Sequence, residues 1–392
     1  MARLIRPVGF LRARRRSALA ATAAIAALLG PLGSARAAGP AACSIKVVSH
    51  PNTSATPFDQ LYGIDALSGS NIWAVGSRDA AGRPLVLHWN GHKWSIVPSP
   101  GKGPTSELND VTAIGPKNVW AVGYYVPTGG GHERTLIEHW NGNKWVIVPS
   151  PNPVGNGANF LKGVDAVSGS NIWAVGANGR PGSKTIIEHW NGNKWVSVAG
   201  APLGNGGDLN DVSAISRANV VAVGHAGITG STQALIERYD GQSWHKETVT
   251  GAVTGADLFG VSTPGANAQW AAGARSGTAS LQTLTVRNTG SGWNVVNSPN
   301  VGSTKINFFN DVSAVSAGNA WAVGERENDS FVRRTLVEHF EGGAWHVVAS
   351  PNVGSGHNRL SGVTTPSGIN VWAAGTAGHP IGSTSLIEHH VC

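Results

Sequence analysis

Charge of either sign, cysteine and long apolar runs are all scarce in this sequence. Charged residues make up 13% of the 392 residues, and only two cysteines, Cys43 and Cys392, are present. The one marked apolar run, Ala18–Leu29, is rich in Ala and Leu and too short to span a bilayer. We therefore expect no membrane span.

The first 37 residues differ in composition from the rest. Six arginines precede the apolar run, and a small-residue site, Ala35-Arg36-Ala37, follows it. This order is typical of a secretory signal peptide, here cleaved near Ala37. Arg15-Arg16 loosely resembles a twin-arginine signal, so both export routes stay open. We expect residues 1–37 to be removed and residues 38–392 to form one secreted, extracellular domain.

The leader also carries the whole excess of positive charge. The chain has 29 Lys+Arg against 22 Asp+Glu, a net charge of +7. Seven of the arginines lie in the first 37 residues, which contain no acidic residue, so 22 charges of each sign remain. A basic patch that could bind nucleic acid loses its main support. We expect no nucleic-acid partner.

What the chain does contain is one short unit used seven times. The stretch Arg134–Asn152, RTLIEHWNGNKWVIVPSPN, returns almost letter for letter at Lys184–Val198 and more loosely elsewhere. Its Asn141-Gly142 pair predicts a two-residue hairpin turn, because such a turn needs positive φ at both central positions. Thr135–Trp140 and Lys144–Pro149 should therefore be paired antiparallel strands.

Two further strands complete the unit, Val119–Gly123 and Leu108–Ile114, and both of their faces are apolar. A strand with one covered face would alternate, so these sheets should be packed between neighbours on both sides. Four strands per repeat at this period are typical of a propeller blade. We predict an all-β, seven-bladed β-propeller of four-stranded antiparallel blades. The first-strand anchors lie 47 to 53 residues apart, at Ile64, Val111, Val164, Val212, Val261, Val312 and Val363.

The two ends of the repeat region complement each other. Residues 45–52 match the fourth strand at Trp145–Asn152 but have no blade before them. Ser385–Val391 matches a third strand and then stops. The N-terminal segment should therefore complete the last blade and close the ring.

In the same alignment, Cys392 and Cys43 fall at the positions of the Asn-Gly hairpin turn. We infer a disulfide in place of the missing turn, with two idle thiols as the alternative. A secreted chain can keep such a bond. Because the bond would close a very long loop, chain entropy sets an upper figure of roughly 5–6 kcal/mol.

The WAVG strand at residues 120–123 and the EHWNG-x-x-W hairpin resemble kelch and galactose-oxidase-type β-propellers. They look most like secreted bacterial propellers with such repeats. The resemblance implies a kelch-like ring, but no kelch partner, because the family's Gly-Gly doublet is here the single Gly123. Copper chemistry of the galactose-oxidase type implies a Cys–Tyr crosslink. Both cysteines are assigned to ring closure, so we expect no cofactor.

Three repeated features could carry chemistry, and for each we favour a structural role. Metal ligands must converge, whereas Glu-His pairs such as Glu138-His139 recur once per blade and point to opposite faces. We expect them to bond between blades and to bind no metal. The tryptophans could stack on sugars, but packing between blades is the better interpretation. Asp110, Asp211 and Asp311 could hold a cation at the channel mouth, although turn capping is favoured.

The repeats also serve as their own comparison set. The turns between first and second strands barely change, whereas the loops between second and third strands vary in length and chemistry. In a propeller these loops share one face, here termed the free face, with the linkers between blades. A face without fold constraints is where function is expected. The candidate binding residues are Tyr124, Tyr125, His132, Arg134, Glu325, Arg326, Arg333 and Arg334.

We therefore predict a secreted, monomeric, non-catalytic binding protein. It would hold an extracellular glycan, a cell-wall polymer or another protein on the free face. The alternatives are an extracellular propeller enzyme, a glycosidase or lyase with its site at the channel mouth, and a purely structural envelope role. Catalysis needs unique, converging polar groups, whereas the polar residues here are repeated or scattered. No catalytic residue is predicted.

Overall fold

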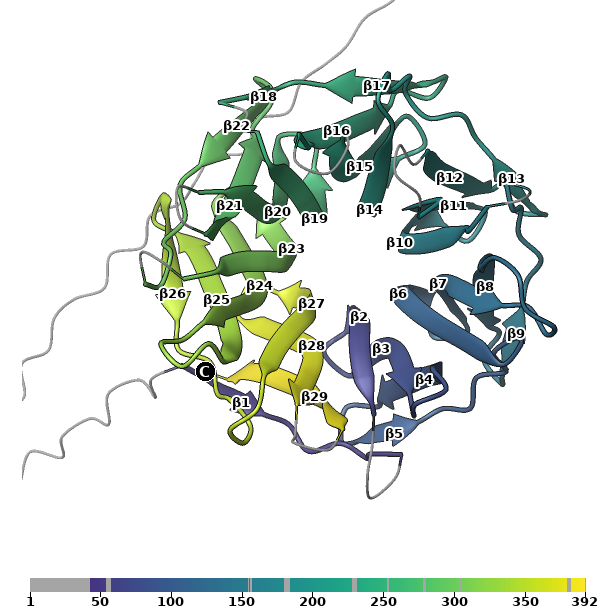
Figure 1. Ribbon diagram of the computed structural model, residues 1–392, viewed down its shortest axis with the longest axis horizontal. Helices are drawn as coiled ribbons and strands as arrows, with labels where there is room; N and C mark the ends of the chain where they lie inside the picture. Colours follow the sequence, from purple (N-terminus) through teal and green to yellow (C-terminus); the bar gives the residue numbers. More distant parts are fainter. Residues whose placement is uncertain are drawn as a thin grey trace, which may run out of the picture. The chain divides into compact units, whose positions relative to one another are not determined.

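Antiparallel pairing of consecutive strands organises the chain into seven sheets arranged in a ring (Figure 1). The computed structural model describes residues 43–391 except 54–57, 154, 156, 180–183, 228–230, 252–253, 278–279, 303–304 and 379–381. Every element in this described part is a β-strand. Within it, no helix is long and apolar enough to cross a membrane. The predicted seven-bladed β-propeller is confirmed.

Each blade is a sheet whose strands follow one another outward from the ring centre. Blade 1 comprises β2 (Gln60–Ser68), β3 (Asn71–Arg78), β4 (Arg83–Trp89) and β5 (Trp94–Ile96); blade 2, β6 (Thr105–Gly115), β7 (Asn118–Val126), β8 (Arg134–Trp140) and β9 (Trp145–Ile147); blade 3, β10 (Phe160–Ser168), β11 (Asn171–Ala177), β12 (Thr185–Trp190) and β13 (Trp195–Ser197); blade 4, β14 (Gly207–Ser216), β15 (Asn219–Ala226), β16 (Gln233–Tyr239) and β17 (Trp244–Glu247).

The remaining blades follow the same order, with one addition. Blade 5 carries a short outer strand that runs parallel to its fourth strand and was not predicted. Blade 5 comprises β19 (Ala256–Gly265), β20 (Ala268–Ser276), β21 (Leu281–Asn288), β22 (Trp293–Val296) and the extra β18 (Val249–Thr250); blade 6, β23 (Asn307–Ser316), β24 (Asn319–Glu327), β25 (Arg333–Glu341) and β26 (Ala344–Val348); blade 7, β27 (Asn358–Ser367), β28 (Asn370–Gly378), β29 (Ser383–Val391) and β1 (Ser44–Val47).

The predicted hairpin forms, but the predicted turn was wrong, because only Gly142 of the Asn141-Gly142 pair has positive φ. Trp140 pairs with Trp145 across the turn, and Gly142 has a φ of 93°, which disfavours residues with a side chain. The fourth strand ends at Ile147, earlier than the predicted Pro149. Proline has no N–H to continue the ladder, so the chain leaves the sheet before it.

The ring closes through its two ends. β1 pairs antiparallel with β29, with Ser44 opposite Val391 and Ile45 opposite His390. The two strands lie side by side in Figure 1. The N-terminal segment therefore completes blade 7, as predicted. Cys392 lies outside the described residues, so the disulfide stays a prediction.

The hydrophobic core is divided among the spaces between blades. The second-strand Trp73 of blade 1 meets the fourth-strand Trp145 of blade 2 edge to face, at 5.5 Å between ring centroids. The tryptophans at these two strand positions are at most 4% exposed. Burial of one such side chain stabilises the fold by roughly 1.5–3 kcal/mol or more. The predicted packing role is therefore confirmed for these two positions.

The third-strand tryptophans are partly buried against the same clusters. Trp140, for example, lies 5.2 Å from Trp73 and donates its indole N–H to the carbonyl oxygen of Pro116. This packing also favours the structural role over a sugar-stacking platform.

Candidate binding site at the channel mouth

All seven first strands carry a β-bulge at the same register. In β6 the pairing shifts between Leu108 and Asp110, which leaves Asn109 without a partner in the ladder. A bulge re-aims the side chain of the extra residue. The seven bulged residues define the channel mouth, a hollow of about 150 Å³: Tyr62, Asn109, Lys162, Asn210, Phe259, Asn310 and Ser361.

In blades 2, 4 and 6 the bulge carries an Asn-Asp pair that fastens the next blade. The Asn109 amide donates to the carbonyl oxygen of Leu161 at 2.7 Å, and the Asp110 carboxylate accepts the Val164 N–H at 2.8 Å. Asn210-Asp211 and Asn310-Asp311 make the equivalent contacts. The expected turn-capping role was wrong, because these N–H groups belong to strands of two blades.

The other four blades have glycine where Asp110 stands, and we term them the glycine blades. A Cβ on Gly63 would lie 2.7 Å from the backbone Cα of Asp110, so an aspartate on one blade requires glycine on the blade before it. Gly163 and Gly260 face Asp211 and Asp311 in the same way. Strict alternation cannot continue around an odd number of blades. Two glycine blades therefore meet at the seam between blades 7 and 1.

Burial raises the pKa of the three aspartates. The pKa of Asp311 rises to about 7, although two backbone N–H groups oppose the shift. The described residues contain no group of three or more His, Cys, Asp or Glu side chains placed to hold a metal ion. The geometry therefore favours an inter-blade fastening role for these carboxylates over a cation site.

The bulged residues of the four glycine blades differ from one another: Tyr62, Lys162, Phe259 and Ser361. The Lys162 amine donates to the Asp208 carboxylate at 3.1 Å and to the Asn210 side-chain oxygen at 2.9 Å. Phe259 lies 6.3 Å from Phe308 between ring centroids. The channel mouth thus combines a phenol, an ammonium group, an aromatic ring and a hydroxyl.

Beside Tyr62 lies Glu107, whose pKa is raised by burial. The Tyr62 hydroxyl donates to the Gln60 side-chain oxygen at 3.2 Å and contacts the Ser77 hydroxyl at 3.1 Å. Burial and the charge of Glu107 raise the pKa of Tyr124. The Tyr124 ring packs edge to face on Phe160, at 4.9 Å between centroids. Tyr124, a predicted contact, therefore reaches the surroundings of the channel mouth.

A polar chain continues from Lys162 across blades 3 to 5. Asn210 donates to the Asp257 carboxylate at 2.8 Å, and His225 contacts the same carboxylate at 3.0 Å. The hydrogen bond to Asp257 raises the pKa of His225. These contacts hold the side chains around Lys162 in fixed positions.

The other predicted residues fall into two groups on the free face, in blades 2 and 6, which are not neighbours in the ring. Arg134 and Arg334 each donate to a linker carbonyl, of Gly155 and Gly356 respectively, so both hold linkers in place. Glu325 pairs with Arg333 at 2.9 Å. The remaining residues vary in exposure: Tyr125 and Arg326 are half-buried, and His132 is exposed.

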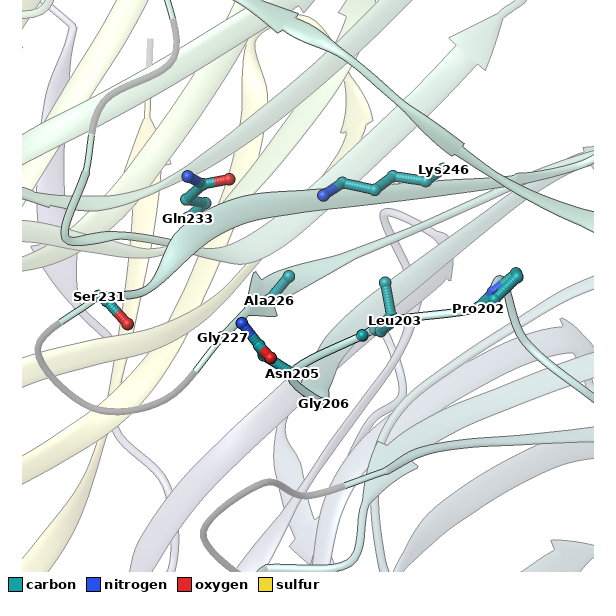
Figure 2. A pocket seen from close by; sticks show the side chains of 10 residues that line it. Pro202, Leu203, Asn205, Gly206, Ala226, Gly227, Ser231, Gln233 and Lys246 are labelled. Atoms are coloured by element: carbon teal, nitrogen blue, oxygen red, sulfur yellow. The ribbon is translucent and has the colours of Figure 1, made fainter.

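Two further hollows open nearby. Phe259 also lines an apolar pocket of about 310 Å³ with Phe308 and Leu281, so this pocket adjoins the channel mouth. A separate pocket of about 240 Å³ is lined by residues of blade 4 and the linker before it. Figure 2 shows Gln233 and Lys246 on one side of that pocket and Leu203 on the other. It shares no lining residue with the channel mouth.

The Glu-His pairs have separate roles on the two sides of their strand. Glu138 is buried and accepts bonds from Ser99 and Gly101 in the linker between blades 1 and 2, as predicted. His139 bonds instead to Asn118 of its own blade and stacks on Trp120 at 4.3 Å. The expectation of bonds between blades was therefore right for this glutamate and wrong for this histidine.

Sequence comparisons and fold comparisons give different answers. No protein-family model and no curated protein matches the chain. Among solved structures, YCF48 bound to D1 peptide matches 89% of this chain and 97% of its own, with 13% identity and a TM-score of 0.55. A GH74 xyloglucanase from Xanthomonas campestris matches 88% of this chain and 55% of its own, with 12% identity and a TM-score of 0.54.

A third match is a PL25 ulvan lyase bound to -[GlcA(1-4)Rha3S]-. It covers 89% of this chain and 94% of its own, with 10% identity and a TM-score of 0.53. Identities this low show a shared β-propeller fold alone.

Sequence reasoning missed the channel-mouth residues Tyr62, Lys162, Phe259 and Ser361. The signal was present as a single varying letter between two repeated ones. The repeats read LYG, LND, LKG, LND, LFG, FND and LSG at this position. A comparison of loops alone passes over a position inside a strand.

Proposed function

We propose that this protein is a secreted, non-catalytic binding propeller that holds an extracellular ligand over the channel mouth. The ligand is a glycan, a cell-wall polymer or a protein. Residues Tyr62, Lys162, Phe259 and Ser361 make its central contacts, and the predicted loop residues of the free face surround them. We also propose that the repeats are kelch-like and that the leader, residues 1–37, directs export of the chain.

One observation carries this proposal. Seven bulges aim seven side chains at one hollow, and the Asn-Asp blades use theirs to fasten the ring. In the glycine blades the bulged side chain makes no contact that is repeated from blade to blade. Its chemistry also differs in each of these four blades. Variation at a converging position favours recognition of one asymmetric ligand.

The fold comparisons are compatible with such a role. The solved structures of similar fold include one bound to a peptide and one bound to a polysaccharide. Those ligands belong to those proteins. They support the general point that ligands of both kinds are held by this architecture.

A binding screen tests the proposal. Residues 38–392, produced under oxidising conditions, would be applied to an array of glycans and cell-wall polymers and to the surface proteins of the producing cell. We expect one selective ligand whose binding falls at least tenfold in Lys162→Ala and Phe259→Ala. Arg217→Gln changes an exposed residue on the opposite face and should bind normally. Binding unaffected by all channel-mouth changes would contradict the proposal.

The enzyme alternative rests on Glu107, which lies between two tyrosines with its pKa raised by burial. A carboxyl with a raised pKa is a candidate for acid catalysis. A glycosidase or lyase would release products from a polysaccharide panel, and Glu107→Gln would abolish the release. No release by the folded protein would remove this alternative.

We also propose that Cys43 and Cys392 form the disulfide that closes blade 7. The support is the pairing of their neighbours, Ser44 and Val391. Mass spectrometry of peptides from unreduced protein would show the linked pair. Recovery of both peptides as alkylated free thiols would contradict the bond.

A further inference from the structure

A hollow of about 430 Å³ is lined mainly by residues of blades 6 and 7 and reaches across the seam between blades 7 and 1 to Gln60; we term it the seam hollow. Its lining comes from three blades. Gln60 lies on β2 and Arg359 on β27, each two residues before a bulged residue of the channel mouth. The seam hollow therefore lies close in sequence to the channel mouth, although the two share no lining residue. Its other lining side chains include Glu325, Arg333, His357 and Thr376.

This seam differs from every other seam of the ring. Each of the other six has an aspartate at the bulge level of one of its blades, whereas here Gly362 meets the strand of Gly63. The two bulged residues at the seam, Ser361 and Tyr62, are both of the variable kind. This seam therefore has no Asn-Asp pair, and Arg359 of blade 7 donates to Gln60 of blade 1 across it.

Arg359 forms no ion pair among the described residues, although its charge acts on the nearby Glu325 and opposes the rise of the Glu325 pKa. One of its terminal nitrogens donates to the neutral Gln60 side chain at 2.7 Å, and its buried Nε has no acceptor among the described residues. Arg333, by contrast, is neutralised by Glu325 at 2.9 Å and Glu327 at 3.7 Å. A buried donor left without a partner is costly, and an anionic ligand would relieve that cost.

Neutral and acidic groups complete the lining. Thr376 is 7% exposed, and its buried hydroxyl has no hydrogen-bond partner in the described part of the chain. Glu325 is 9% exposed and presents a carboxylate to the same hollow. Gln60 adds an amide. One arginine without a direct ion pair thus stands among groups that can donate to or accept from hydroxyls.

We propose that the seam hollow binds a carboxylated sugar residue, a uronic acid, within a larger glycan. Arg359 receives the sugar carboxylate through charge-assisted hydrogen bonds. Thr376 and Gln60 bond to ring hydroxyls, and Glu325 accepts from another hydroxyl. The volume is within the range of roughly 300–1,000 Å³ that small-molecule sites occupy.

The lining favours an acidic sugar over an acidic peptide. A run of peptide carboxylates would meet Glu325 and Glu327, which repel further negative charge. A uronic acid brings one carboxylate together with several hydroxyls, and hydroxyls can donate to Glu325. This inference rests on the proposed function, since it names the ligand class for one part of the same surface.

Calorimetry with trigalacturonic acid and its carboxyl-reduced trimer tests the inference. We expect the wild-type chain to bind the acid form at least tenfold more tightly than the reduced form. Arg359→Gln should lose that preference, and Thr376→Val should weaken binding of both forms. The matched control, Arg217→Gln, removes the same charge from the opposite face and should retain the wild-type preference. Circular dichroism would confirm that each variant folds.

Four results would overturn the inference. Equal binding of the acid and reduced trimers would show that the carboxylate is not recognised. Equally tight binding of a poly-glutamate peptide would show recognition of charge without a sugar. The chain could bind another ligand through Lys162 and Phe259 and yet bind neither trimer. That result would contradict this inference and would still support the proposed function. A folded chain that binds nothing in either experiment would contradict both.

Discussion

The Asp211 carboxylate of blade 4 accepts the backbone N–H of Val261 in blade 5 at 2.7 Å, and its second oxygen accepts the N–H of Val212. One side chain thereby satisfies donors on two blades. The same contact recurs from Asp110 to Val164 and from Asp311 to Val363. The ring is therefore held at its inner edge by side chains that pair with the backbone, in addition to the tryptophan clusters.

Asp211→Ala should destabilise the ring. The substitution leaves two buried N–H groups without acceptors, and each such group costs about 1–3 kcal/mol. We expect the free energy of unfolding in urea to fall by about 2–5 kcal/mol. Asp329→Ala, at a fully exposed position, is the control and should change the value by less than about 0.5 kcal/mol. Equal effects of the two changes would refute the fastening role.

Gly63→Ala should destabilise through a steric conflict. The added Cβ would lie 2.7 Å from the Cα of Asp110, and the backbone can relieve that contact only by shifting. Overpacking of this kind costs about 1–3 kcal/mol. Gly115→Ala adds the same atom on the next first strand, where nothing lies within 4 Å, and should be neutral. Thermal unfolding of both variants measures the difference, and a stable Gly63→Ala protein would contradict the Asp–Gly alternation.

Glu338 should make stability depend on pH. Burial raises its pKa to about 8 from 4.5, and neither carboxylate oxygen has a partner in the described part of the chain. The folded protein therefore retains a proton that the unfolded chain releases. This contribution is fully present below about pH 4.5 and is lost as the pH rises towards 8, by at most about 1.4 kcal/mol per pH unit.

Glu338→Gln should remove the Glu338 contribution, so that stability falls less steeply between pH 5 and pH 8, and should exceed the wild type in stability at pH 8. Urea unfolding at pH 5 and pH 8 measures both effects. Glu341→Gln, on the same strand but 65% exposed, should leave the wild-type pH profile unchanged. Parallel pH profiles for wild type and Glu338→Gln would show that the buried carboxyl does not titrate in this range.

Local patterns predicted the parts of the fold that depend on neighbours in sequence. Asn141-Gly142 predicted the hairpin, and the match of residues 45–52 to a fourth strand predicted ring closure. The role of Asp110 could not be predicted in this way, because its partner, Val164, is 54 residues away and belongs to another blade. The parallel pairing of β18 with β22 likewise joins segments that are far apart in sequence, so local patterns did not predict it.

The candidate site was predicted only in part. Loop comparison located the free face and Tyr124, which reaches Glu107 beside the channel mouth. It missed Lys162 and Phe259, because both stand at a varying position inside a first strand, and loops alone were compared. It also gave no reason to expect that two glycine blades meet at one seam, which follows from the number of blades.

The central claim is that the bulged side chains of the glycine blades bind the ligand. Its most direct test compares the affinities of Phe259→Ala and Phe331→Ala for the ligand that the binding screen identifies. Phe331 is the control, because its ring is 70% exposed in a loop of blade 6. We predict at least a tenfold loss of affinity for Phe259→Ala, with normal binding by Phe331→Ala and unchanged folding of both. Full affinity in a folded Phe259→Ala and Lys162→Ala double variant would contradict the claim.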